Sequence, residues 1–167
     1  ASPTFADVNG DGALDLVVGS EDGTIKVRLN SGSDTWPTEA FGVANPFDGV
    51  NVGGSAAPTF ADVNGDGALD LVVGSSYGTI TVILNSGSNT WPTANPFDGV
   101  RLTYTSINGE AVAAASPTFA DVNGDGALDL VVGSYLVVGS YDGTIKVWLN
   151  SGSDTWPTEA LGAANPF

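Results

Sequence analysis

The chain has no cysteine, no methionine and no histidine, and only 4 of its 167 residues are lysine or arginine. The missing cysteines exclude disulfide bonds and thiolate metal sites. Without histidine or cysteine, the usual general bases and nucleophiles of enzymes are also missing, so we expect no catalytic activity. Apolar runs such as Leu16–Val18 are far too short to span a bilayer, which predicts no membrane insertion.

Negative charge is abundant. Nineteen acidic residues against four basic ones give a formal net charge of −15. Such a chain repels phosphate backbones and anionic membrane surfaces, so nucleic acid is not an expected partner, and it attracts cations. Hydrophobic residues make up 42% of the sequence, which is enough to form a packed core.

One unit is repeated three times along the chain. The segment that begins at Pro3 and reads PTFADVNGDGALDLVVGS recurs unchanged from Pro58 and from Pro117, with periods of 55 and 59 residues. A fixed period of this length is typical of repeat architectures. We therefore divide the chain into repeat 1 (residues 1–47), a connector (48–55), repeat 2 (56–97), a second connector (98–114) and repeat 3 (115–167).

Repeat 3 differs from the others because the hexapeptide LVVGSY occurs twice in succession, at residues 130–141. An even insertion keeps the alternation of side chains along a strand. No physical reason for the duplication is evident from the sequence.

Each repeat predicts short strands and no helix. In repeat 1, Thr4–Ala6 is β-prone, and Leu16–Gly19 is an apolar run of the kind found in strands covered on both faces. Asp22-Gly23 is a hairpin signal, and Thr24–Leu29 alternates between apolar and polar residues. Trp36 then opens a fourth, outer strand. Four strands in a radial repeat are the pattern of a β-propeller blade, so the predicted fold class is all-β.

Three blades are too few for a closed propeller, which typically has four to eight. Either two or more copies of the chain assemble into one ring as a homo-oligomer, or the chain is part of a longer propeller. A β-solenoid is the competing architecture, although its repeats are usually much shorter than 55 residues.

An acidic loop, Asp-x-Asn-x-Asp-Gly-x-x-Asp, follows the first predicted strand of every repeat. Calcium prefers about six to eight oxygen ligands from carboxylates, amides, carbonyls and water. Alternating oxygen donors can converge on one such ion if the backbone curls around it, with one backbone carbonyl completing the set. The pattern predicts three Ca²⁺ ions, bound by Asp7, Asn9, Asp11, Ala13 and Asp15, by Asp62, Asn64, Asp66, Ala68 and Asp70, and by Asp121, Asn123, Asp125, Ala127 and Asp129.

The acidic loop fits an EF-hand or a magnesium site less well than a calcium site. An EF-hand needs flanking helices and a glutamate at its twelfth position, which is Val18 in repeat 1, so it is rejected. Magnesium is disfavoured because it demands strict octahedral geometry. The remaining alternative is an acidic turn that hydrogen-bonds its own backbone without a metal.

The complete motif extends through Leu-Val-Val-Gly and begins at Asp7, Asp62 and Asp121. It resembles the FG-GAP and VCBS repeats of integrin α-subunit propellers and of many secreted microbial proteins. The resemblance implies a calcium ion in each loop, an extracellular location, and a role in adhesion or carbohydrate binding.

Positions that differ among the repeats are the candidates for ligand recognition. One outward position of the alternating strand is Arg28, Ile83 or Trp148 in the three repeats, and the preceding turn contains Tyr77 or Tyr141 in repeats 2 and 3. We name Arg28, Tyr77, Tyr141 and Trp148 as candidate ligand-binding residues, because aromatic rings can stack on a sugar. The alternative is that these residues pack between blades.

The tryptophans that follow the second turn do not vary between repeats, and we expect them to be core wedges. They are Trp36, Trp91 and Trp156. The sequence as a whole favours a secreted, calcium-stabilised propeller module that binds a glycan or a protein surface without catalysis. A purely structural scaffold is the alternative, and part of a polysaccharide-acting propeller enzyme is a second one, because aspartate pairs can serve glycoside hydrolysis.

Overall fold

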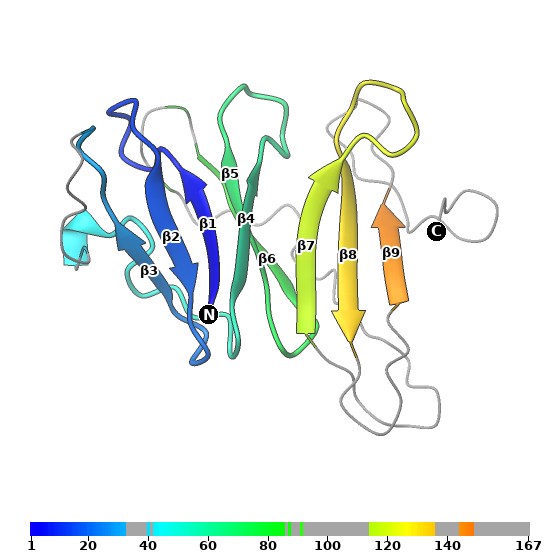
Figure 1. Cartoon of the computed structure of the whole chain (residues 1–167), viewed down its shortest axis with the longest axis horizontal. Coiled ribbons are helices and arrows are strands. Elements are labelled where there is room, and N and C mark those ends of the chain that lie inside the picture. The colour runs from blue at the N-terminus through cyan, green and yellow to red at the C-terminus, as the bar shows by residue number, and fades with distance from the viewer. Residues whose placement is uncertain are drawn as a thin grey trace.

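The computed structural model describes residues 1–32, 42–85, 114–135 and 144–148, together with Ala40, Gly87 and Trp91. These residues form three antiparallel sheets, each built from one repeat (Figure 1). The strands are β1 (Ser2–Ala6), β2 (Asp15–Gly19) and β3 (Ile25–Arg28); β4 (Ala57–Ala61), β5 (Asp70–Gly74) and β6 (Ile80–Ile83); and β7 (Ala114–Ala120), β8 (Asp129–Tyr135) and β9 (Thr144–Trp148).

The described residues contain one further element, the 3₁₀ turn η1 (Gly42–Ala44). Within this part of the chain, no helix has the length and apolar character needed to cross a membrane. The all-β prediction is confirmed.

Each sheet is a meander with the same register. Thr4 lies opposite Val17 in the first sheet, and Thr59 and Thr118 lie opposite the corresponding valines in the other two. The predicted hairpin turn joins β2 to β3, where Gly23 has a φ of 86° that side chains rarely adopt. The turn residues and the alternation of apolar and polar side chains therefore determine where the first three strands of each repeat form.

The fourth strand predicted from Trp36 lies outside the described residues. One residue of that region is described: Ala40 forms an antiparallel bridge to Val27 of β3, and its amide donates to the Val27 carbonyl at 2.8 Å. The outer edge of the first sheet is thus paired where a fourth strand was predicted, and the strand itself stays a prediction.

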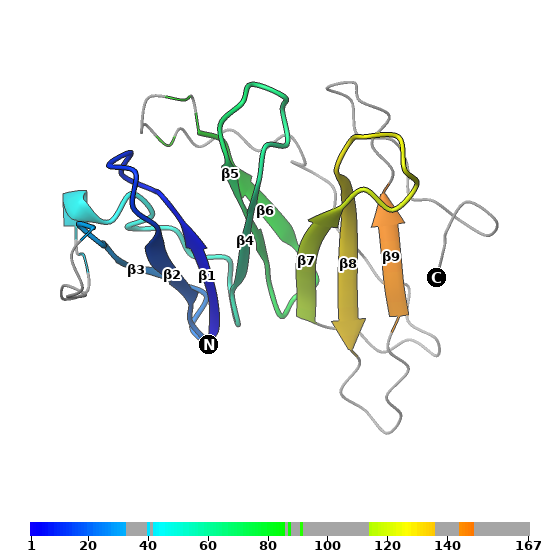
Figure 2. The ribbon, with the colours of Figure 1, turned by 45° about the horizontal axis from the view of Figure 1, so that its top comes forward.

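The three sheets are arranged around their first strands. β1, β4 and β7 stand side by side at the centre, with the rest of the first sheet on one side and the rest of the third sheet on the other (Figure 1). The turned view in Figure 2 shows the same order. The three acidic loops lie at one end of these strands, which we call the acidic rim, and the β2–β3 and β5–β6 turns lie at the opposite end, the turn rim.

Two apolar cores join neighbouring sheets. The first core packs Val17 and Val27 of the first sheet against Leu71, Val73 and Ile83 of the second. The second core packs the opposite face of the second sheet against the third, with Ala61, Val63, Val72, Ile80 and Val82 meeting Ala115, Leu130 and Val132.

The predicted strand with two covered faces is found in the middle sheet. β5 is buried at all five positions, whereas β2 alternates between buried and half-buried residues. The prediction made from Leu16–Gly19 is therefore wrong for repeat 1, because among the described residues its sheet has a neighbouring sheet on one face only.

Candidate metal centre

The acidic loop of repeat 1 curls around the carboxylate of Asp7, the first residue after β1. Asp7 Oδ1 accepts the amide protons of Gly10 at 2.6 Å and Asp11 at 3.2 Å, and its Oδ2 accepts that of Gly12 at 2.8 Å. Gly10 and Gly12 have φ values of 76° and 86°, which glycine adopts without steric cost. One aspartate followed by two suitably spaced glycines therefore specifies the curl.

The middle of the loop is held by two side chains. Asn9 Oδ1 accepts the amide proton of Asp11 at 2.9 Å, and Asp11 Oδ1 accepts that of Ala13 at 2.9 Å. The Asn9 amide group also donates to Asp11 Oδ2 at 3.2 Å. In both of these Asx turns, a side-chain oxygen accepts the amide proton of the residue two positions later. Oxygen-bearing side chains at every second position therefore hold the loop in its curled form.

The last acidic residue of the loop, Asp15, is 0% exposed at the start of β2. Its Oδ2 accepts the amide proton of Val8 at 3.0 Å, and its Oδ1 accepts that of Asn30 at 2.7 Å. Burial raises the pKa of Asp15, these two hydrogen bonds oppose the rise, and the neighbouring charges of Asp11 and Asp7 add to it. The buried carboxylate thus joins both ends of the loop to the end of β3.

The other two loops repeat this geometry. In the second, Gly65 and Gly67 donate to Asp62 at 2.8 Å each, and Asp70 accepts from Val63 at 2.9 Å and from Asn85 at 2.7 Å. Burial raises the pKa of Asp70, as it does that of Asp15.

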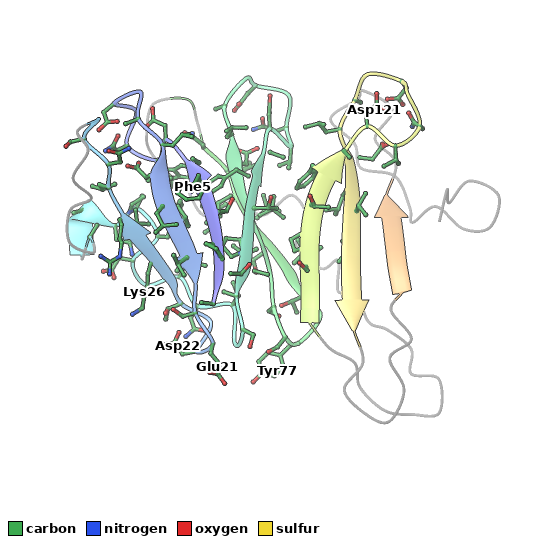
Figure 3. The ribbon with its side chains drawn as sticks, viewed as in Figure 1. Phe5, Glu21, Asp22, Lys26, Tyr77 and Asp121 are labelled. Carbon is green, nitrogen blue, oxygen red and sulfur yellow. The ribbon has the colours of Figure 1, made fainter. Side chains whose placement is uncertain are left out.

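In the third loop, Gly124 and Gly126 donate to Asp121 at 2.6 and 2.9 Å. The Gly126 hydrogen bond is the main reason that the pKa of the exposed Asp121 is lowered. Asp129 is 0% exposed and accepts the amide proton of Val122 at 2.9 Å. Identical sequence thus produces three equivalent loops. Figure 3 labels Asp121 of the third loop at the acidic rim.

Whether these loops suit a metal can be judged from their donors. No group of three or more His, Cys, Asp or Glu side chains in the described part of the chain is arranged to hold a metal ion. A site in this loop therefore needs the asparagine and carbonyl oxygens as well. The donor set is all oxygen, the oxygens of Asp11 and Asp15 keep lone pairs beyond the one hydrogen bond that each accepts, and the charges that act on the pKa of Asp15 are both negative. The chemistry fits a hard cation such as calcium.

Tyr77 occupies the turn rim (Figure 3) and is 70% exposed. Its ring lies over Gly53, because a Cβ built on that glycine would be 2.8 Å from the Tyr77 ring atoms Cδ2 and Cε2. In the first sheet the corresponding residue is Asp22, whose Oδ1 accepts from the Thr24 amide at 3.0 Å and from its hydroxyl at 2.6 Å. The hydroxyl bond is the main reason that the pKa of Asp22 is lowered.

In the second sheet the side chain of Ser75, rather than that of residue 77, caps this turn. Ser75 Oγ accepts the amide proton of Tyr77 at 3.1 Å and lies 2.6 Å from the hydroxyl oxygen of Thr79. Because the serine caps the turn, position 77 does not need a carboxylate and can present an aromatic ring to solvent.

The remaining candidate ligand residues are not brought together. Arg28 is exposed, but it pairs with Leu16 near the acidic rim, whereas Tyr77 lies at the turn rim. The outward position assigned to Ile83 is wrong, because this side chain is 5% exposed in the first core, where β6 faces the first sheet.

Two candidates cannot be placed by their side chains. Tyr141 lies outside the described residues, and Trp148 is described only as the backbone partner of Leu130.

The wedge prediction is confirmed for Trp91. Its ring packs edge-on against Phe47, with centroids 4.9 Å apart, and lies 6.2 Å from that of Phe60. Its indole nitrogen donates to the Val8 carbonyl at 3.2 Å, which links repeat 2 to the acidic loop of repeat 1. Trp36 and Trp156 lie outside the described residues.

Sequence reasoning missed the structural use of the repeated Ala-Asn-Pro-Phe segment. Asn45 is buried, and its side chain donates to the Ile25 carbonyl at 3.0 Å and accepts from the Phe47 amide at 2.9 Å. Phe47 is 0% exposed. The invariance of this segment in all three repeats was the available signal.

A cavity of about 350 Å³ between the sheets was also missed. It is lined by Ala1, Ser2, Ser20, Glu21, Ser55, Ala56, Ala57, Ala115 and Ser116. Its lining comes from three separate repeats, so no local sequence pattern indicates it.

Three repeated antiparallel sheets, arranged around their first strands and packed face to face, define a set of β-propeller blades in an open arc. Comparison with protein families agrees. The FG-GAP-like repeat matches residues 7–73 and 62–132, and the WD domain G-beta repeat matches residues 123–148. The chain belongs to the FG-GAP-like repeat family, whose repeats form propeller-type binding or scaffold modules. No curated protein and no solved structure matches it significantly.

Proposed function

We propose that the chain is an extracellular, calcium-stabilised propeller module that binds a glycan or a protein surface without catalysis. The observation that supports it most directly is the threefold recurrence of one loop. In each loop the same hydrogen bonds curl the same all-oxygen donor set around the first aspartate, and a buried aspartate closes the loop. A solvated turn needs no buried carboxylate, and at Asp15 and Asp70 the charges of two neighbouring aspartates raise the pKa in addition to burial.

Calcium would be held by the first two aspartates, the asparagine, the backbone carbonyl and the buried last aspartate of each loop. Three ions would change the formal net charge from −15 to −9 and relieve the repulsion within each loop. At free calcium about a hundred times the dissociation constant, each site would stabilise the folded state by about 2.7 kcal/mol. Extracellular calcium is high enough for this role.

The calcium proposal is tested by titrating chelator-stripped protein with calcium while following heat release and the melting temperature. We expect saturable binding and a higher melting temperature. Asp11→Ala should remove one site and part of the thermal gain. Asp22→Ala is the matched control, because both aspartates are exposed and accept an amide proton from the residue two positions later. No calcium response of the unsubstituted chain, or equal losses in both variants, would refute the proposal.

Glycan recognition is the finer part of the proposal, and Tyr77 supports it. An exposed ring seated on glycine backbone is a preformed surface on which a sugar can stack. A glycan array with calcium present tests this. Tyr77→Phe should keep binding because the ring remains, and Tyr77→Asn should lose it. A blank array with correctly folded protein would favour the scaffold alternative.

A further inference from the structure

Each blade has two faces that pack differently. The forward face, with Ala6, Val8 and Val17 in blade 1, packs on the next blade along the chain. The rear face, with Leu71 and Val73 in blade 2, packs on the preceding blade. Blades 2 and 3 meet in the same way. Both interfaces between neighbouring blades, which we call seams, therefore join a forward face to a rear face.

Among the described residues, no blade packs on the forward face of blade 3. Ala6, Val8 and Val17 in blade 1 and their counterparts in blade 2 are 0–4% exposed. In blade 3 the same residue types occupy these positions, but Ala120 is exposed and Val122 and Val131 are half-buried. Identical residues thus have different burial because blades 1 and 2 have a following blade packed on this face.

Nor does any blade in the described part of the chain pack on the rear face of blade 1. Leu71 and Val73 are 0% exposed in blade 2, and Val132 is 0% exposed in blade 3. The corresponding Leu16 and Val18 of blade 1 are only half-buried. Phe5 on the same face is 55% exposed and is labelled on β1 in Figure 3. One molecule therefore presents an uncovered forward face and an uncovered rear face, which are complementary to each other.

The two internal seams repeat one geometry, which indicates how a further seam would form. The Ala56 amide donates to the Ser20 carbonyl at 2.9 Å, and the Ala115 amide donates to the Ser75 carbonyl at 2.8 Å. A Cβ on Gly19 would lie 2.1 Å from the Ala56 carbonyl oxygen, and one on Gly74 would lie 2.1 Å from that of Ala115. The same step thus leads from blade 1 to blade 2 and from blade 2 to blade 3, which follow one another in chain order (Figure 2).

We propose that two copies of the chain associate head to tail, the forward face of blade 3 in each copy packing on the rear face of blade 1 in the other. The two seams are related by a two-fold axis and close a ring of six blades, within the usual range of four to eight. A second copy of the chain is the expected partner for these two faces, because they carry the same residue types that already pack against each other between blades of one chain.

Charge supports the same contact. Lys26 and Arg28 lie on the rear face of blade 1, at positions where blade 2 has Thr81 and Ile83. Each copy has a formal net charge of −15, so two basic side chains at the contact reduce the repulsion between copies. None of the apolar residues of the contact is itself a proposed calcium ligand, and Tyr77 lies away from it, so a calcium response without a dimer, or a dimer without a calcium response, distinguishes the failure of one proposal from the failure of the other.

The test is the mass of the full chain in solution, measured by sedimentation equilibrium over a range of concentrations with calcium present. We expect a mass twice the 16.8 kDa of the chain. Phe5→Asp on the rear face and Ala120→Arg on the forward face should each shift the mass to 16.8 kDa. Tyr77→Asp, which changes an exposed aromatic away from both faces, should leave the dimer intact. A 16.8 kDa unsubstituted chain, or a species larger than the dimer, overturns the proposal.

Mixing the two variants separates head-to-tail association from other arrangements and from misfolding. In a mixed pair, one seam combines the unsubstituted forward face of the Phe5→Asp chain with the unsubstituted rear face of the Ala120→Arg chain. We therefore expect dimer to reappear in the mixture although neither variant dimerises alone. A mixture that stays monomeric, or sensitivity to only one of the two substitutions, contradicts the head-to-tail arrangement.

Discussion

Asp15 and Asp70 are the residues on which the loop structure depends most. Each carboxylate is fully buried, yet both of its oxygens accept amide protons from segments that are otherwise separate, the acidic loop and the end of a strand. Burying a carboxylate is costly unless hydrogen bonds or a cation compensate. Here two amides compensate in part, and two neighbouring aspartates act against them.

Asp70→Ala should lower the free energy of unfolding by about 1–3 kcal/mol, because the amides of Val63 and Asn85 lose the carboxylate that accepts their protons. Urea unfolding in the presence of chelator measures this without a contribution from calcium. Asp66→Asn is the control, because Asp66 is exposed and can keep its bond to the Ala68 amide. Equal losses in the two variants would show that the buried bonds to Val63 and Asn85 contribute little.

The pH dependence of stability should change sign with calcium. The folded-state pKa values of Asp15 and Asp70 are raised above the usual 3.8, so the folded chain binds protons more tightly than the unfolded chain at these two sites. Their contribution to stability is fully present below pH 3.8 and is lost as the pH rises through the raised values. The chelated protein should therefore become more stable on acidification from neutral pH toward about 4.

With calcium bound, acidification should destabilise the protein instead, because protonation of the ligands releases the ion. The pKa values of the exposed Asp22 and Asp121 are lowered, so these two carboxylates change the stability only at a pH below the range from neutral to about 4. Urea midpoints across this pH range, with chelator or with calcium, measure both trends. Parallel trends in the two series would contradict a role for these carboxylates in calcium binding.

At the scale of elements, the seams between blades depend on close backbone approach. Gly74 in β5 faces the backbone of Ala115 in β7, and the equivalent Gly19 in β2 faces Ala56. Such contacts let the first strand of one blade lie against the middle strand of its neighbour. The glycine that ends the Leu-Val-Val-Gly run of repeats 1 and 2 is therefore a packing residue of the fold.

Gly74→Ala should destabilise the protein by about 1–3 kcal/mol, because the new methyl group can be accommodated only if two blades move apart. Gly54→Ala is the matched control, since its Cβ would meet the movable Ser76 hydroxyl oxygen at 2.7 Å. Thermal unfolding of both variants measures the difference. A Gly54→Ala variant as unstable as Gly74→Ala would mean that backbone approach is not the limiting contact.

For the whole molecule, the important feature is the gathering of all three acidic loops at one rim (Figure 1). With a net charge of −15, the chelated chain repels itself, and salt screens this repulsion. Raising sodium chloride from about 0.02 to 0.5 M should therefore raise the melting temperature in chelator, and should raise it less with calcium bound. Differential scanning calorimetry in the four conditions measures both shifts. An equal salt effect with and without calcium would indicate that the ion leaves the rim charge unchanged.

The sequence predicted the local structure well because local spacing causes it. The hairpin at Asp22-Gly23 and the burial of Ile25 and Val27 follow from turn chemistry and alternation within a few residues. The sequence could not predict which blade faces are covered. Arg28 and Ile83 occupy the same strand position, yet one is exposed and the other is in a core, because the second sheet, unlike the first, has a described blade packed on that face.

The repeat, the antiparallel strands and the acidic loops were determined by the sequence alone, because each depends on interactions between residues close along the chain. Tertiary structure decided the rest: that the three loops share one rim, that Tyr77 rests on Gly53, and that Trp91 reaches Val8 of another repeat. These contacts join segments far apart in the sequence. They arise because apolar faces of neighbouring blades must bury each other, and the order of blades in space selects which faces meet.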